Sequence, residues 1–291
     1  MKRLLVAGAG SFVGTAVQTH LAKWPDRYSV TVVDMQSPDW READFASHDA
    51  VFHVAGLAHA DVGRVSEERK ALYYKVNSEL PAETAAKAKA AGVKQFIFMS
   101  SAIVYGDSAP IGRPKTITRD TPPAPANFYG DSKLQAEKKL LPLASAAFKV
   151  AILRCPMIYG KGSKGNFPVL EKMALKMPFF PKVENARSML YAGNLAEFVR
   201  LLLENGDGGI FWPCNAELSD TSRLVRLIAR AHGRKLPLVP GFTPLLKLLS
   251  RFSPYVDKAF GNLAYAPGLG DYRSDYRRFS LEQSISETES P

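Results

Sequence analysis

A tyrosine and a lysine four residues apart form the pair in this chain best suited to proton transfer. Tyr129 and Lys133 stand in a segment whose pattern predicts a helix, so their side chains share one face. A phenol is a poor base at neutral pH because its ordinary pKa is near ~10. A neighbouring ammonium and the positive charge of a bound oxidised hydride acceptor both favour the phenolate and should lower that pKa. The phenolate could then take a proton from a hydroxyl while a hydride leaves the adjacent carbon.

A serine completes this candidate catalytic set. Ser101 directly follows the run Gln95–Ser100, whose apolar core predicts a buried strand. At the mouth of that strand its hydroxyl could hydrogen-bond the phenol oxygen and orient it. Because Tyr-x-x-x-Lys pairs are common in helices, the assignment depends on a hydride acceptor being bound elsewhere in the chain.

The first element that must accompany this chemistry is a dinucleotide site, and the N-terminus predicts one. Leu4–Ala7 is typical of a buried parallel strand, and Val13–Lys23 has an amphipathic helical pattern. The glycines between them permit a tight turn, where a phosphate reaches the first backbone N–H groups of the helix. The residues expected to contact the cofactor here are Gly8, Gly10, Ser11, Phe12, Val13 and Gly14.

An acidic residue after the second predicted strand indicates which dinucleotide the chain would bind. The next strand, Ser29–Val33, ends in Asp34, 20 residues after Gly14. A carboxylate there can accept the ribose hydroxyls of adenine dinucleotides and would repel a 2′-phosphate, so we expect NAD, with NADP as the alternative.

Further cofactor contacts are expected where later strands end. Asp49–Val54 predicts the third strand, and the small-residue turn after it lies at the carboxyl edge, where ligands bind. A long helix is expected over residues 66–91, with one polar side chain among its apolar ones. The additional residues assigned to the cofactor are Asp44, Phe45, Ala55, Gly56, Asn77 and Ser100, and His59 is assigned to the substrate.

Composition bounds the class of protein. The 291 residues are 46% hydrophobic, and no apolar run approaches the ~18 residues of a membrane span. Met1–Val6 is interpreted as a mature strand and not a signal peptide. Cys155 and Cys214 offer neither a disulfide framework nor metal-ligand spacing, so we expect buried thiols, a cytoplasmic protein and no metal.

Charge is unevenly placed along the chain. The net charge is +10, and between Arg223 and Arg278 there are eleven Lys/Arg against three Asp. An excess of this kind suits an anionic small substrate or an anionic membrane surface. Nucleic acid is not expected as a partner, because the chain has no aromatic-basic RNA signature and no zinc-finger spacing.

Taken together, the motifs at Gly8–Gly14, Ser100–Gly106 and Tyr129–Lys133 resemble the extended short-chain dehydrogenase/reductase family. Within it the chain is similar to the NAD-dependent epimerase/dehydratase group that acts on nucleotide sugars. The resemblance implies a Rossmann-type α/β fold with a smaller C-terminal lobe, and a catalytic triad of Ser101, Tyr129 and Lys133. It also implies that Lys133 holds the nicotinamide ribose and that Pro156 lines the nicotinamide. Ser11 stands where the family usually has glycine.

One departure from the family narrows the reaction. Sugar 4,6-dehydratases of this family follow the catalytic serine or threonine with an Asp-Glu pair, whereas this chain has Ala102 and Ile103. Neither side chain can transfer a proton, so a 4,6-dehydratase is not expected. The main prediction is a UDP-sugar 4-epimerase for surface polysaccharide precursors, and the alternative is a 4-ketoreductase of a UDP-N-acetylhexosamine. A non-catalytic dinucleotide-binding regulator is a third reading, opposed by the retained triad.

The second half is assigned to the nucleotide sugar. We expect a dinucleotide domain at 1–160 and a substrate lobe at 161–291, with residues 185–205 partly returning to the first domain. Lys164 and Asn166 open a predicted helix whose N–H groups could meet a diphosphate, and Arg187 resembles the arginine that grips it in relatives.

One C-terminal segment has a pattern that could indicate a binding partner. Residues 243–252 read TPLLKLLSRF, an amphipathic pattern typical of a helix facing the core with solvated cations. The same pattern would suit docking on anionic lipid. Helix-mediated dimers are usual in the family, so the resemblance also implies a homodimer.

Overall fold

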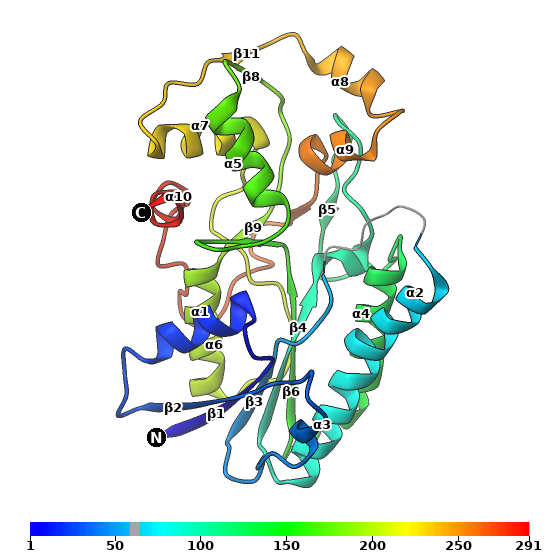
Figure 1. Cartoon of the computed structure of the whole chain (residues 1–291), viewed down its shortest axis with the longest axis vertical. Helices are drawn as coiled ribbons and strands as arrows, with labels where there is room; N and C mark the ends of the chain where they lie inside the picture. Colours follow the sequence, from blue (N-terminus) through cyan, green and yellow to red (C-terminus); the bar gives the residue numbers. More distant parts are fainter. Residues whose placement is uncertain (59–64, 291) are drawn as a thin grey trace. The chain divides into compact units, whose positions relative to one another are not determined.

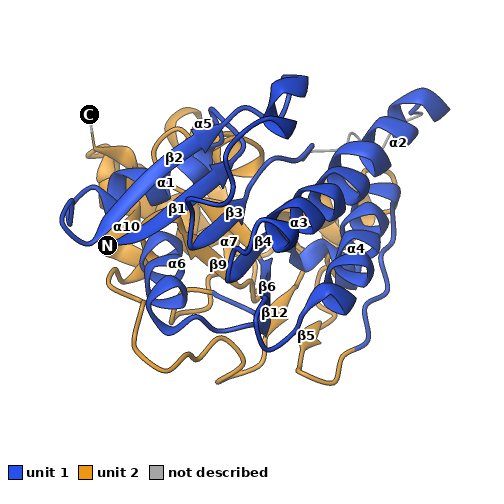
Figure 2. Ribbon diagram, turned by 90° about the horizontal axis from the view of Figure 1, so that it is seen from below, with its two compact units in different colours: residues 1–106, 122–155, 195–213 blue, residues 107–121, 156–194, 214–291 orange. Residues whose placement is uncertain are grey.

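The computed structural model describes residues 1–58 and 65–290, and these form two compact units. Unit 1 comprises Met1–Gly106, Pro122–Cys155 and Leu195–Pro213, and unit 2 comprises the remaining described residues of the chain (Figure 2). Among the described residues, no helix combines the length and the apolar character that crossing a bilayer requires.

Unit 1 is built on a six-stranded sheet in which every pairing is parallel. Most of its side chains are buried, which agrees with the near-continuous apolar runs of the strands. In spatial order the strands are β10 (Gly209–Phe211), β6 (Lys149–Cys155), β4 (Gln95–Ser101), β3 (Ala50–His53), β1 (Lys2–Ala7) and β2 (Tyr28–Val33). This confirms the predicted Rossmann-type fold.

Helices cover both faces of this sheet. On one face lie α1 (Phe12–Leu21) and α6 (Ala192–Asn205), and on the other lie α2 (Glu67–Tyr74), α3 (Leu80–Ala90) and α4 (Phe128–Leu140) (Figures 1 and 2). The chain runs outward from β1 in one direction to β2 and in the other to β3. The strand order therefore reverses between β1 and β3, and the carboxyl ends at such a switch point form the usual ligand crevice.

The long helix expected over residues 66–91 is interrupted. A π-helical turn, Lys75–Glu79, separates α2 from α3. Pro81 stands in the first turn of α3, and its ring removes the N–H that would bond the carbonyl of Asn77. The backbone accommodates this loss by widening one turn, and such π turns are frequent at functional sites.

Unit 2 is mainly helical, with three short parallel strand pairs. Its helices are α5 (Asn166–Lys176), α7 (Thr221–Ala231), α8 (Thr243–Leu249), α9 (Pro254–Phe260) and α10 (Leu281–Glu289). The strand pairs are β5 (Thr116–Ile117) with β12 (Ala264–Tyr265), β7 (Met157–Tyr159) with β9 (Met189–Tyr191), and β8 (Phe180–Pro181) with β11 (Leu238–Val239). α7 packs against α5 and α10 around buried Phe167, Leu224 and Ile228.

Candidate active site

The glycine turn after β1 is shaped by a close approach to the turn after β3. Gly8 has φ +135°, and a Cβ there would lie 2.7 Å from the backbone nitrogen of Ala55. A Cβ on Gly14 would lie 3.1 Å from Val6, so this glycine lets α1 pack directly on β1. Ser11 has an ordinary φ of −69° and caps α1, its Oγ accepting from the nitrogen of Gly14. The positive φ values of this loop fall at Gly8 and at Gly10 (φ +68°), which explains why Ser11 need not be glycine.

Asp34 lies beside this turn. The nitrogen of Gly8 donates to the carbonyl of Val33 at 2.9 Å, which holds the end of β2 against the glycine loop. The Asp34 carboxylate is exposed, and one oxygen accepts from the nitrogen of Gln36 at 2.9 Å. These features fit an adenine dinucleotide. The glycine turn and the N-terminus of α1 can receive its phosphates, and the adjacent carboxylate can receive its ribose hydroxyls.

Tyr129 is brought to β4 by the residue that follows it, Gly130. α4 begins after Asn127, whose Oδ1 accepts from the nitrogen of Gly130 at 2.9 Å. A Cβ on Gly130 would lie 2.8 Å from the carbonyl oxygen of Ile103, so the helix rests on the segment after β4. In this arrangement the Ser101 hydroxyl lies close enough to the Tyr129 phenol to lower its pKa.

In the protein alone, burial dominates the pKa of Tyr129. Burial raises it to about 12, and the neighbouring Ser101 hydroxyl only partly opposes this shift. The expected lowering by Lys133 is not found, because the lysine ammonium is directed at other groups. In the protein itself the phenol is therefore protonated at neutral pH.

Lys133 is buried beneath the turn after β3. Its Nζ donates to the carbonyl of Met99 at 3.0 Å and lies 4.8 Å from the centre of the Phe98 ring. A Cβ on Gly56 would lie 3.2 Å from the same Nζ, so glycine is needed for the turn to pass over the lysine. Burial lowers the pKa of Lys133 to about 8, with Glu137 opposing the shift.

Asn77 lies in the π turn and bonds both to the turn after β3 and to helix α4. Its side chain is fully buried, and its Oδ1 accepts from the nitrogen of Leu57 at 2.8 Å. Its Nδ2 donates to the carbonyl of Leu57 at 3.0 Å and to Ser132 Oγ at 3.2 Å. These bonds fix the turn after β3 against α4, so the amide assigned to the cofactor acts in this structure as a positioning group.

A buried polar network behind the site was missed in the sequence. Arg154 pairs with Glu137 at 2.6 Å and donates to the hydroxyl of Tyr105 at 2.7 Å, which also accepts from Trp212 at 2.7 Å. The hydroxyl of Ser100 donates to Glu137 at 2.5 Å. The side chain of Ser100, predicted to contact the cofactor, therefore faces the interior, because successive residues of a strand point to opposite faces.

The other residues that the sequence assigned to the cofactor differ in their exposure to solvent. The ring of Phe45 is buried in the core of unit 1. Asp44 is exposed and accepts from the nitrogen of Ser47 at 3.2 Å. Phe12 and Val13 are half-buried in the first turn of α1, and Pro156 is buried at the start of a unit 2 segment. His59 lies outside the described residues.

The three residues assigned to the diphosphate lie in unit 2. Lys164 and Asn166 are exposed at the start of α5, which has no side-chain N-cap bond. Arg187 is half-buried, and its Nη1 donates to the carbonyls of Lys258 and Ala259. Burial lowers its pKa, and no carboxylate pairs with it within the described part of the chain. A buried guanidinium without a protein counter-ion suits an anionic ligand.

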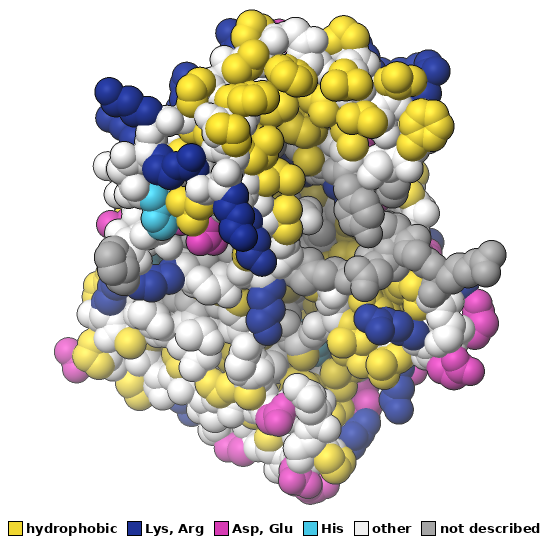
Figure 3. Space-filling model, turned by 45° about the horizontal axis from the view of Figure 1, so that its top comes forward, with side chains coloured by type: hydrophobic (Ala, Val, Ile, Leu, Met, Phe, Trp, Pro, Cys, Tyr) yellow, Lys and Arg dark blue, Asp and Glu magenta, His cyan; other side chains and the backbone are white. Residues whose placement is uncertain are grey.

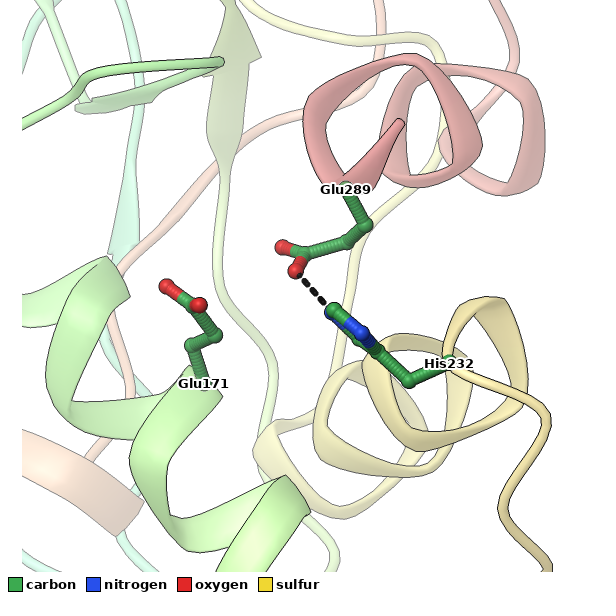
Figure 4. Close-up of side chains that lie close together, drawn as sticks. All are labelled: Glu171, His232 and Glu289. Carbon is green, nitrogen blue, oxygen red and sulfur yellow. Dashed lines mark hydrogen bonds and ion pairs between the residues drawn. The ribbon is translucent and has the colours of Figure 1, made fainter. Parts of the chain in front are cut away.

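A separate cluster in unit 2 has donors that suit a metal ion. Glu171 of α5, His232 after α7 and Glu289 of α10 converge, with ligand atoms within 4.8 Å of one another (Figure 4). Nε2 of His232 lies 2.7 Å from Glu289, whose side chain is only 4% exposed. Burial raises the pKa of Glu289. The cluster shares no residue with the dinucleotide turn or the catalytic set.

Comparison with known proteins gives one family. The model of the NAD dependent epimerase/dehydratase family matches residues 4–211. The chain is 29% identical to a UDP-glucose 4-epimerase of Vibrio cholerae, over 90% of this chain and 86% of that protein. It is 29% identical to the N-acetyl-alpha-D-glucosaminyl-diphospho-ditrans,octacis-undecaprenol 4-epimerase of Escherichia coli O157:H7, over 80% and 73%. A dTDP-4-dehydrorhamnose reductase of Clostridium acetobutylicum has the same fold, with a TM-score of 0.75, 18% identity and 98% of each chain covered.

Proposed function

Since the chain belongs to the NAD-dependent epimerase/dehydratase family, we propose that it is a nucleotide-sugar 4-epimerase for surface polysaccharide precursors. The observation that carries this proposal is the close approach of the Ser101 hydroxyl to the Tyr129 phenol, with Lys133 buried under the turn after β3 in the same unit as the glycine loop. Two 4-epimerases among the relatives, each aligned over most of its length, support the choice of C4.

The cofactor we assign is NAD. The exposed carboxylate of Asp34 beside the glycine turn suits ribose hydroxyls and disfavours a 2′-phosphate. When bound, the nicotinamide supplies a site that accepts a hydride and returns it. We assign Lys133, whose Nζ lies under Gly56, to binding the ribose beside that ring.

We assign the proton transfer to Tyr129, with Ser101 as the orienting group. We propose that the positive charge of a bound oxidised nicotinamide would favour loss of the Tyr129 proton. The Tyr129 phenolate would then take the proton of the sugar 4-hydroxyl as C4 loses its hydride, and would return that proton when the hydride returns to the opposite face. Ser101 holds the reacting oxygens in line with the phenol. Proton and hydride are both restored, so the reaction changes configuration without net oxidation.

Substrate binding is assigned to unit 2. Arg187, Lys164 and Asn166 are proposed to bind the diphosphate of a UDP-hexose or UDP-N-acetylhexosamine. The support is the buried guanidinium of Arg187, which has no carboxylate partner within the described residues, and the uncapped start of α5. Ala102 and Ile103 follow Ser101, so these two positions carry no carboxyl group that could eliminate water.

A second candidate, a 4-ketoreductase, is favoured by one observation. With a pKa of about 12, Tyr129 carries its proton at neutral pH and can donate it to a 4-keto oxygen. That reaction would consume one reduced nicotinamide for each sugar, whereas the epimerase consumes none.

The test is a panel of UDP-glucose, UDP-N-acetylglucosamine, their C4 epimers and the corresponding 4-keto-6-deoxy sugars, each with NAD or NADH. Product configuration is followed by NMR and the cofactor by absorbance. Interconversion of C4 epimers with no net change in NADH supports the epimerase. Stoichiometric NADH loss with a keto sugar alone supports the reductase. Binding of NAD without turnover of any sugar would contradict both.

A further inference from the structure

Helix α8 exposes a row of large apolar side chains that the reaction does not use. Leu245, Leu248, Leu249 and Phe252 are 50%, 50%, 43% and 80% exposed. Their spacing of i, i+3, i+4 and i+7 places them on one side of a helix. The nitrogen of Phe252 donates to the carbonyl of Leu249 at 3.0 Å, so the helical path extends past the last residue of α8. We call these four residues the α8 face.

The sequence-based expectation that this segment faces the core was wrong. No residue of α8 is buried. Leu246 alone of the α8 leucines packs, half-buried, against the core of unit 2, and it holds the helix so that the α8 face points to solvent. The apolar surface extends beyond the helix, because the exposed ring of Phe179 lies 5.7 Å from that of Phe242, just before α8. Hydrophobic side chains accordingly gather across the top of Figure 3.

Both charged side chains of α8 and the turn that follows it are cationic. Lys247 and Arg251 are exposed on the same helix, and Arg251 is next to the apolar row on the helical wheel. From Arg223 to Val256 the chain has seven Lys/Arg and no Asp or Glu. A lysine or arginine at the edge of an apolar face can keep its charge in water while its stem covers apolar surface.

The apolar row and its neighbouring cations indicate which kind of partner could bind the α8 face. A second copy of this chain would bring the same cations against each other in a two-fold interface, at a net charge of +10 for each copy. A stable protein interface also buries about 800 Å² on each partner, more than one helix of two turns supplies. An anionic bilayer meets both requirements, because leucine and phenylalanine enter the acyl boundary while cations meet headgroups.

We propose that the α8 face docks the protein onto an anionic phospholipid bilayer, with α8 lying in the interfacial plane. The exposed leucines and Phe252 insert, and Arg251 at the edge of the α8 face contacts the lipid phosphates. This proposal rests on α8 and its surroundings alone, so it stands or fails independently of the reaction assigned above.

The test is co-sedimentation of the full chain with vesicles of phosphatidylcholine, alone or mixed with phosphatidylglycerol. We expect binding to the mixed vesicles, with loss as ionic strength rises, since exposed charges are screened by salt. Leu248→Ser combined with Phe252→Ser should weaken binding about tenfold or more through lost insertion. Lys247→Glu with Arg251→Glu should also weaken it, and this variant leaves the apolar side chains intact.

Leu72→Ser is the matched control, because Leu72 is 48% exposed on α2, in the other unit. It should bind vesicles as the parent does, and circular dichroism and sedimentation velocity of all variants check folding and oligomeric state. Absence of binding to the mixed vesicles, equal binding to neutral ones, or unchanged binding by both α8 variants would overturn the proposal. A change from dimer to monomer in the serine variant, with vesicle binding retained, would instead identify the α8 face as an interface between copies.

Discussion

The Cβ that Gly130 lacks would lie 2.8 Å from the carbonyl oxygen of Ile103. This close approach lets the first turn of α4 rest on the backbone that follows Ser101. The catalytic phenol is the neighbouring residue, so its contact with the serine depends on this glycine.

Gly130→Ala should therefore damage catalysis through geometry alone. The added methyl group must push α4 from the segment after β4, separating Tyr129 from Ser101. Displacement of a reacting group by about 1 Å can reduce turnover about 100-fold. We expect kcat to fall by that order, with a loss of about 1–3 kcal/mol in unfolding free energy from overpacking. Steady-state kinetics and chemical denaturation measure the two effects, and an unchanged kcat would show that the close contact has no catalytic role.

Tyr129→Phe should abolish turnover while leaving NAD binding intact. The substitution removes only the hydroxyl that moves the proton, which contributes typically about 10²–10⁴-fold to rate. NAD affinity by calorimetry should be close to that of the parent, because the glycine turn and Asp34 are untouched. Full activity in this variant would remove the proposed mechanism.

Lys133→Met should lower activity and raise stability together. Burial lowers the pKa of Lys133 from 10.5 to about 8, so the unfolded chain binds the proton more readily than the native protein between these values. Stability contributed by this group rises with pH across that window, and at neutral pH the buried ammonium is a cost. Methionine should raise the unfolding free energy at pH 7 by about 1–3 kcal/mol, and this gain should shrink above pH 8. Denaturation at several pH values checks both; a loss of stability at pH 7 would contradict the assignment of a desolvation cost.

His53→Leu should reduce the acid sensitivity of the protein. His53 is fully buried between Phe96 and Phe98, and neither ring nitrogen has a hydrogen-bond partner in the part of the chain described here. Its pKa is lowered from 6.5 to about 3, so the neutral ring is favoured in the native state. Stability from this group is present above pH 6.5 and is lost as pH falls toward 3. Between pH 7 and pH 5 the melting temperature of the variant should fall less than that of the parent; equal slopes would contradict this origin.

Asp34→Ala should change cofactor preference. Loss of the carboxylate removes an acceptor for the ribose hydroxyls and the repulsion of a 2′-phosphate. We expect the KM for NAD to rise about tenfold and the preference for NAD over NADP to fall. Asp39→Ala is a suitable control, because this exposed aspartate lies nearby and bonds only its own turn at Ser37. Equal KM values for NAD in the parent and the Asp34 variant would place the ribose elsewhere.

The sequence alone determined the parallel sheet and the glycine turn after its first strand, and it singled out a candidate catalytic trio. Apolar runs, the spacing of Gly8, Gly10 and Gly14, and the interval to Asp34 are local signals that depend on strand and helix periodicity. They identified the Rossmann-type fold and its first strands, and they singled out Tyr129 and Lys133 as neighbours on a helix face.

Only the tertiary structure decided the properties that arise from burial. Whether Tyr129 is acidic depends on how much solvent its hydroxyl loses, and no spacing of residues reveals that the pKa rises. The same holds for Ser100, which turns inward to Glu137, and for the leucines of α8, whose apolar pattern is identical whether they meet a core or solvent. Sequence periodicity fixes which side chains share a face, whereas the long-range packing of other segments fixes what that face meets.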